Sequence, residues 1–162
     1  VYISMVNKAE KYCWFMTPYL IITDEMTHAL TLAAKRGVDV RIITPGIPDK
    51  KQIYSITRSF YHGLVKDGVR IYEWTPGFCH AKMSVADDCM ATCGTINLDY
   101  RSLYHHFENG CFMTDCDAVL DIRNDLEATM KECREVTEKY RVGRSAYLRL
   151  GQLFMRLFAG LL

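Results

Sequence analysis

Two segments of the chain have closely related sequences, and they constrain its fold more than any other feature. They are RGVDVRIITP at 36–45 and DGVRIYEWTP at 67–76. In each, a glycine follows a stretch of helical apolar periodicity and precedes a short apolar run that ends before Thr-Pro. Gly37 and Gly68 are therefore predicted to end helices in the left-handed conformation, and the runs after them to be strands. Two such units in series favour parallel strands joined by helical crossovers.

Apolar periodicity and turn residues predict the other elements. The expected helices cover 24–36 (with Asp24 as N-cap), 50–66 and 117–133, and the expected strands cover 12–17, 38–43, 69–74, 80–86, 90–93 and 107–113. No long helix separates the last three strands, so that part of the sheet is expected to be antiparallel or mixed. Residues 1–143 are thus predicted to form one α/β domain, a mixed sheet with helices on both faces in an α/β/α sandwich.

Residues 144–162 are predicted to form a C-terminal amphipathic helix, beginning at about Ser145. Its polar side carries Arg149, Gln152 and Arg156, and its apolar stripe consists of Leu150, Leu153, Phe154, Leu157, Phe158 and Leu161. Such a helix would either dock on the domain or its partner, or lie in a membrane interface with its basic side chains reaching the headgroups.

Composition narrows the kinds of site that the chain can carry. The net charge is +1, which gives no support for strong nucleic-acid binding, because proteins that bind phosphate backbones usually have a basic excess. The seven cysteines include no CxxC pair, so neither a disulfide framework nor a zinc site is predicted. The chain begins at Val1 and shows no signal peptide or apolar run long enough to span a bilayer. We expect a processed chain or a piece of a longer protein.

The segment from Cys79 to Ser102 concentrates groups suited to phosphoryl chemistry. His80 and Lys82 are two apart on a predicted strand, so both side chains are expected on one face. An imidazole beside an ammonium is costly to bury unless an anion such as phosphate is its partner.

More such groups follow along the same segment. Asp87 lies near a predicted turn, and Gly94 lies at a strand end where the backbone can be approached closely. Thr95 and Asn97 then add a hydroxyl and an amide donor. One short segment therefore offers a nucleophile or base, a cation and donors for non-bridging oxygens.

These residues follow the pattern H-x-K-x4-D-x6-G-T-x-N, which resembles the HKD signature of the phospholipase D superfamily. The flanking sequences resemble bacterial cardiolipin synthases over essentially the whole chain, and match the second of that family's two HKD halves. The resembling stretches are TPYL at 17–20, AAKRGVDVRIITPGIPD at 33–49, NLDYRS at 97–102 and FE at 107–108. The resemblance implies a phospholipase D-like half-domain.

The resemblance also implies a mechanism and a set of roles. In the superfamily, one histidine attacks the phosphodiester and forms a phosphohistidine, while a second protonates the leaving alcohol and deprotonates the incoming one. Carried over, His80 is one of these imidazoles, and its role as nucleophile or acid-base stays open. Lys82 and Asn97 would bind non-bridging oxygens, Glu108 would hydrogen-bond the catalytic imidazole, and Asp87 would orient groups near the site.

Thr95, Arg101 and Tyr19 are expected to bind substrate, and no metal or cofactor is expected. The implied substrate is phosphatidylglycerol as both donor and acceptor, with glycerol released and cardiolipin formed. The implied partners are the N-terminal HKD half of the same protein, or a second copy as a homodimer, and the membrane surface. The full-length protein is expected at the cytoplasmic face of the cell membrane, and this stretch alone is expected to be soluble.

Three hypotheses remain open at this point. The chain is a lipid-transfer domain carrying half a site, or a single-motif homodimeric phosphodiesterase or nuclease, or a phosphate-binding module without chemistry. The near-neutral charge counts against a nucleic-acid substrate.

Overall fold

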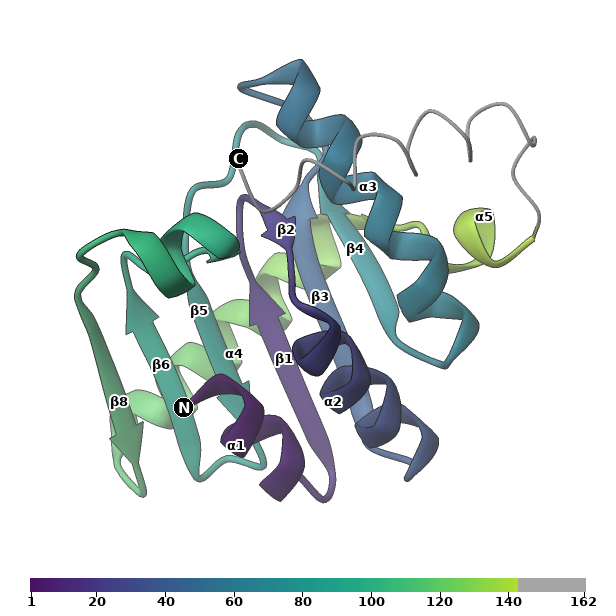
Figure 1. Cartoon of the computed structure of the whole chain (residues 1–162). Coiled ribbons are helices and arrows are strands. Elements are labelled where there is room, and N and C mark those ends of the chain that lie inside the picture. The colour runs from purple at the N-terminus through teal and green to yellow at the C-terminus, as the bar shows by residue number, and fades with distance from the viewer. Residues whose placement is uncertain (143–162) are drawn as a thin grey trace.

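The computed structural model describes residues 1–142, and its centre is a seven-stranded mixed sheet (Figure 1). The strands are β1 (Tyr12–Met16), β3 (Asp39–Pro45), β4 (Arg70–Trp74), β5 (Met83–Ala86), β6 (Met90–Gly94), β8 (Gly110–Thr114) and β9 (Cys133–Glu135). Their order across the sheet is β8-β6-β5-β1-β3-β4-β9. Strands β1, β3 and β4 are parallel, as the repeated units predict, and β5, β6 and β8 are antiparallel, as expected.

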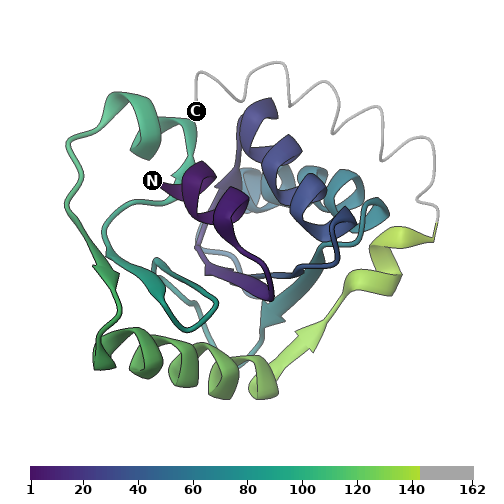
Figure 2. The ribbon, with the colours of Figure 1, turned by 90° about the horizontal axis from the view of Figure 1, so that it is seen from below.

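Helices cover both faces of this sheet, which confirms the predicted α/β/α sandwich. The helices are α1 (Tyr2–Lys8), α2 (Asp24–Lys35), α3 (Lys51–Lys66), α4 (Asp117–Glu132) and α5 (Thr137–Arg141). Figures 1 and 2 show α1, α2 and α3 on one face and α4 on the other. Alternating residues of β1 supply the two cores: Cys13 and Phe15 pack toward α1–α3, and Trp14 and Met16 toward α4.

The helix ends follow local backbone chemistry. Gly37 and Gly68 have φ values of 96° and 102°, so both are the left-handed stops that the sequence predicts. The N-cap of α2 is Thr23 rather than Asp24. Thr23 has an extended backbone and its hydroxyl accepts a hydrogen bond from the Met26 amide at 3.2 Å, while Asp24 already lies in the first helical turn.

The strand predicted at 80–86 is shorter in the structure, where β5 begins only at Met83. Its partner β1 ends at Met16, which pairs with Met83, and Thr17-Pro18 then leads the chain away from the sheet. His80 and Lys82 therefore lie in an irregular segment just before β5. The strand expected at 107–113 likewise begins later, at Gly110.

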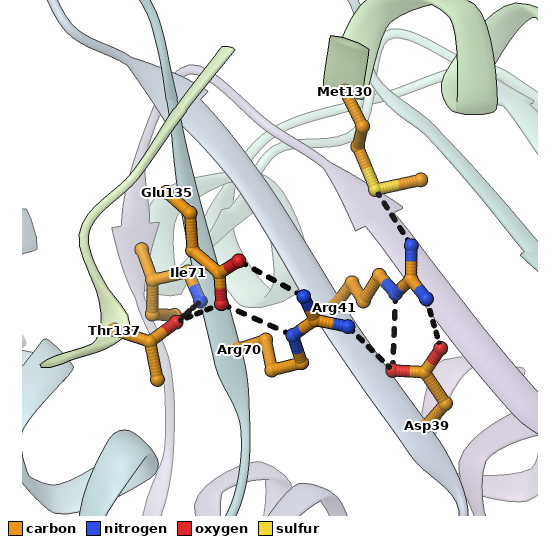
Figure 3. A network of polar contacts seen from close by, with 7 residues as sticks. All are labelled: Asp39, Arg41, Arg70, Ile71, Met130, Glu135 and Thr137. Carbon is orange, nitrogen blue, oxygen red and sulfur yellow. Dashed lines mark hydrogen bonds and ion pairs between the residues drawn. The ribbon is translucent and has the colours of Figure 1, made fainter.

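The lower edge of the sheet in Figure 1, where β1, β3 and β4 begin, is closed by paired charges (Figure 3). The Arg70 guanidinium donates two hydrogen bonds to the Glu135 carboxylate at 2.9 and 3.1 Å. Asp39 lies between Arg41, at 2.5 Å, and Arg70, at 3.9 Å. Thr137 completes the network by accepting from the backbone amide of Ile71 and donating to Glu135. These bonds tie β9 to the start of β4.

A buried ion cluster centred on Glu73 of β4 also holds β4 to its neighbours. The Glu73 carboxylate is fully buried and receives hydrogen bonds from Arg58 at 2.6 Å and Arg134 at 2.9 Å. Because Arg58 belongs to α3 and Arg134 to β9, one carboxylate joins a strand to elements on both sides of it.

Residues 143–162 are outside the described part, and so is the amphipathic helix expected there. Within residues 1–142, no helix has the length and apolar character needed to cross a membrane.

Replacing Glu73 with Gln should lower the free energy of unfolding by roughly 3–5 kcal/mol, because it leaves two arginines around a site that has lost its charge. Urea unfolding followed by circular dichroism measures this. The matched change Glu135→Gln removes a carboxylate from a partly exposed pair and should cost about 1 kcal/mol or less. Equal losses in the two variants would contradict the special role of Glu73.

Candidate functional site

Strand register brings the motif residues to one edge of the sheet. Met16 of β1 pairs with Met83 of β5, and Met83 pairs with Cys93 of β6. The residues just beyond these pairs therefore lie together at the upper edge in Figure 1, where β1 and β6 end and β5 and β8 begin. The positions so placed are Thr17, Lys82, Gly94 and Thr95.

His80 and Lys82 meet at this edge, as predicted, although neither is in a strand. The Lys82 ammonium lies 3.0 Å from Nδ1 and 3.1 Å from Nε2 of His80, and donates to the His80 carbonyl oxygen at 2.7 Å. Burial lowers the pKa of Lys82, while the charges of Glu108 and Asp99 partly oppose that shift. The Lys82 backbone is held in turn by the Gly94 amide, which donates to its carbonyl at 3.2 Å. The cation is thus fixed against an exposed imidazole.

Close backbone contact fixes the other half of the motif. Gly94 faces Gly110 across β6 and β8, and a Cβ on Gly94 would collide with the backbone of Asn109 and Gly110. The Thr95 amide donates to the Asn109 carbonyl at 2.8 Å. Only glycine at this position lets these two segments approach so closely, and this approach brings Glu108 next to Thr95.

Glu108 is bound by neighbours other than the expected imidazole. The Thr95 hydroxyl donates a short hydrogen bond to one oxygen of the Glu108 carboxylate, and His106 Nδ1 lies 3.6 Å from the other oxygen. The hydrogen bond from Thr95 lowers the pKa of Glu108, partial burial opposes this, and Ser102 and His106 lower the pKa further. These contacts favour the ionised form of the carboxylate. Glu108 is connected to the motif by the hydroxyl of Thr95.

Asn97 is held in place by a hydrogen bond to Ser102. Its Nδ2 donates to the Ser102 hydroxyl at 3.0 Å, while its Oδ1 is buried without a hydrogen-bond partner in the described structure. The Ser102 amide donates to Asp99 at 2.7 Å. Because a hydroxyl can donate as well as accept, the amide of Asn97 can exchange its two ends and keep its bond to Ser102.

A small second sheet holds the Asn97 segment in place. Strands β2 (Leu20–Ile21) and β7 (Leu98–Asp99) pair in parallel, with Leu20 opposite Leu98. The buried Thr17 hydroxyl accepts from the Leu98 amide at 3.1 Å and donates to the Tyr19 carbonyl at 2.8 Å. Thr17 therefore joins the end of β1 to the segment that follows Asn97.

Tyr19 and Arg101, both predicted to bind substrate, line one pocket with Asn97. The pocket has a volume of about 150 Å³, and Lys50, Asp99, Ser102 and His106 also contribute to its wall. The Tyr19 hydroxyl donates to Asp49 at 2.5 Å. Arg101 begins a π-helical turn, η1 (Arg101–His105), which directs the chain from Asn97 back toward Glu108.

Asp87 lies away from these groups, at the far end of β5. Its carboxylate accepts hydrogen bonds from the backbone amides of Glu10 at 2.7 Å, Lys11 at 2.9 Å and Tyr12 at 2.8 Å. The expectation that Asp87 orients groups near His80 is therefore replaced by another role. Asp87 ties the β5–β6 turn to the start of β1 at the lower edge.

Sequence reasoning missed three residues that shape the site: Thr17, Ser102 and Lys50. Thr17 and Ser102 stand in the quoted runs TPYL and NLDYRS, and their burial at 1% and 6% exposure marks them as polar groups with internal partners. Lys50 is an exposed residue before a helix and carries no comparable signal.

The site brings together an imidazole, an ammonium, a carboxamide, a hydroxyl and an ionised carboxylate. Such a set can attack a phosphodiester and stabilise charge on its oxygens. Within residues 1–142, no group of three or more His, Cys, Asp or Glu side chains is placed to hold a metal ion.

A family model described as the phospholipase D-like domain of cardiolipin synthase matches residues 2–130. An uncharacterized protein of Streptococcus mutans is 50% identical over 162 residues, which are 100% of this chain and 35% of that protein. Cardiolipin synthase 2 of Bacillus cereus is 35% identical over the same 162 residues, or 32% of its length. The chain thus spans about a third of the length of these curated relatives.

Solved structures share the fold at low sequence identity. Phosphatidylserine synthase of Haemophilus influenzae superposes with a TM-score of 0.74 and 17% identity, over 98% of this chain and 41% of that one. The phospholipase D family member Nuc of Salmonella typhimurium superposes with a TM-score of 0.71 and 17% identity, over 82% of this chain and 86% of that one.

The Thr95→Val variant should raise the pKa of Glu108 toward the ordinary glutamate value of about 4.3, because it removes the hydrogen bond that most lowers it. The pKa lies below its unfolded value, so this bond stabilises the fold above the unfolded pKa, and that stability is lost as the pH falls through the folded pKa. NMR titration of the Glu108 carboxyl carbon measures the change. Thr114→Val is the exposed control, and an unmoved Glu108 pKa in Thr95→Val would contradict the assignment.

The Asp87→Ala variant should lower the free energy of unfolding by roughly 2–3 kcal/mol, because three backbone amides lose a charged acceptor. Asp87→Asn should cost less, since it keeps one acceptor oxygen and tolerates the positive φ of 52° at this position. Chemical denaturation gives the losses, and NMR shifts of the His80 ring should stay unchanged in both variants. A shifted His80 with unaltered stability would show that Asp87 acts on the site after all.

Proposed function

Because this chain belongs to the family described as the phospholipase D-like domain of cardiolipin synthase, we propose that it supplies half of a phosphatidyltransferase site. The protein that contains it would condense two phosphatidylglycerol molecules into cardiolipin and glycerol. The contact of the Lys82 ammonium with the His80 ring is the observation that carries this proposal. If His80 met the phosphorus, this cation would lie beside a non-bridging phosphate oxygen.

The chemistry needs a second imidazole from outside this chain. One ring nitrogen attacks phosphorus and the glycerol oxygen leaves, so a phosphohistidine forms and the leaving oxygen takes a proton from the other histidine. The hydroxyl of the second phosphatidylglycerol then gives its proton back to that histidine and attacks phosphorus, which frees the first. A ring bonded to phosphorus cannot carry that proton as well, so two histidines are required.

The other motif residues would act on charge and position. Lys82 would neutralise a non-bridging oxygen, and Asn97 would donate to another once its amide has exchanged ends. Glu108 would act through Thr95, which holds the loop between Gly94 and Asn97 against β8. Thr95 would thus position the loop, and Tyr19 and Arg101 would face the headgroup from their shared pocket.

The second imidazole has two possible sources, which an experiment separates. The relatives are about three times as long as this chain, which supports an N-terminal HKD half of the same polypeptide. The proposed protein would act on lipids at the cytoplasmic face of the cell membrane. A homodimeric phosphodiesterase, in which each copy supplies one His80, is the alternative.

His80→Ala in the protein as encoded should reduce cardiolipin formation by about 10²–10⁴-fold, the usual contribution of a catalytic acid or base, or by more if His80 is the nucleophile. The assay follows cardiolipin and released glycerol from phosphatidylglycerol vesicles. His28→Ala, on the exposed side of α2, is the matched control and should keep full activity.

Mixing experiments identify the partner and test the proposal further. Activity of this chain that appears only with an added N-terminal half supports transfer by two halves of one protein. Activity of this chain alone that rises with the square of its concentration supports the homodimer instead. Lipid binding without turnover in the encoded protein, unaffected by His80→Ala, would refute an enzymatic role.

A further inference from the structure

The pocket lined by Tyr19, Asn97 and Arg101 has features that the transfer of a phosphatidyl group does not by itself require. Two of its wall residues, Lys50 and Arg101, are exposed cations from separate elements: the residue before α3 and the first residue of η1. Neither side chain forms an ion pair within residues 1–142. Two cations at one pocket that form no ion pair with its carboxylate are suited to an anionic ligand.

The carboxylates nearby are already engaged. Asp99, which also lines the pocket, accepts from the Ser102 amide at 2.7 Å. Asp49 accepts from the Tyr19 hydroxyl and from the Lys50 amide, at 2.5 and 2.6 Å. The wall of the pocket nevertheless carries two cations, Lys50 and Arg101, against one carboxylate, Asp99, so its formal charge excess is positive.

The pocket is also joined to the proposed reaction site. Asn97 and Ser102 belong to both, and Ser102 lowers the pKa of Glu108 by hydrogen bonding. The volume of about 150 Å³ is below the roughly 300–1,000 Å³ of pockets for drug-sized ligands. It suits one small polar group next to the reacting phosphate.

We propose that Lys50 and Arg101 bind the phosphate of the acceptor lipid, a second phosphate that does not react. This inference rests on the proposed function. In that reaction the acceptor is a glycerol whose own phosphodiester stays intact while its free hydroxyl attacks. Arg101 would hold that phosphate with two hydrogen bonds, Lys50 would add a point charge, and the hydroxyl would extend toward the phosphorus at His80. The pocket would thereby select a phosphate-bearing alcohol over a neutral one.

A binding experiment tests the pocket independently of turnover. Calorimetric titration of the encoded protein carrying His80→Ala compares glycerol phosphate, inorganic phosphate and glycerol. We expect glycerol phosphate to bind most tightly, and Lys50→Gln or Arg101→Gln each to weaken it about tenfold, since each removes a charged hydrogen bond. Lys51→Gln, one residue further on the exposed start of α3, should change nothing.

Two binding results would overturn the proposal. Glycerol phosphate that binds equally well to the Lys50→Gln, Arg101→Gln and parent proteins would show that the two cations do not hold it. Inorganic phosphate that binds as tightly as glycerol phosphate would assign the pocket to free phosphate rather than to a lipid headgroup.

Acceptor competition then tests selectivity in the active protein. Phosphatidyl groups labelled in the donor are partitioned among phosphatidylglycerol, free glycerol and water. The double variant Lys50→Gln, Arg101→Gln should lower transfer to phosphatidylglycerol at least about tenfold more than it lowers transfer to glycerol or water. Arg101→Lys should recover part of the selectivity. Equal losses for all acceptors would refute the inference, whereas no transfer to any acceptor by the unaltered protein would refute the proposed function instead.

Discussion

The antiparallel insertion of β5 between β1 and β6 is the constraint on which the site depends. In this register Met83 faces Met16 on one side and Cys93 on the other. Every strand end near these pairs therefore points to the same edge, and residues from distant parts of the sequence meet there. A shift by one residue would turn the side chains of β5 to the opposite face and move Lys82 away from the edge.

The polar groups at the two edges of the sheet differ in how completely they are paired. At the lower edge, Asp87 and the charges around Arg70 are matched by backbone amides or opposite charges (Figure 3). At the upper edge, within residues 1–142, Lys82 contacts an imidazole rather than a carboxylate, and the Oδ1 atom of Asn97 has no hydrogen-bond partner. Saturated groups stabilise a fold, whereas unsaturated groups cost stability and are kept where a ligand can use them. The carboxylate that the motif names, Asp87, belongs to the stabilising edge.

Sequence reasoning recovered the features that depend on local chemistry. The repeated segments predicted the parallel units, and glycine conformations predicted the helix ends at Gly37 and Gly68. The pattern H-x-K also predicts that His80 and Lys82 lie together, although the segment that holds them is irregular and not the expected strand. These features are set by a few neighbouring residues, so short patterns are sufficient to find them.

The features that were missed depend on contacts between distant residues. Strand β9 has three residues and exists because its antiparallel pairing with β4 is supported by Arg70 and Glu135, 65 positions apart. The resemblance implies the catalytic imidazole as the partner of Glu108, whereas the structure pairs Glu108 with the hydroxyl of Thr95. The contact of Gly94 with Gly110 decides it by bringing β8 against the residue that precedes Thr95.

That contact between two glycines has a wider consequence. Main-chain atoms alone set the distance between β6 and β8 at this point, so that distance does not depend on the rotamer of any side chain. Lys50 and Arg101, in contrast, stand on a loop and on a helical turn at the rim, where replacement disturbs no strand pairing. Under the proposed function, substitutions at these two positions would change which alcohol is accepted while the pairing of the strands stays intact.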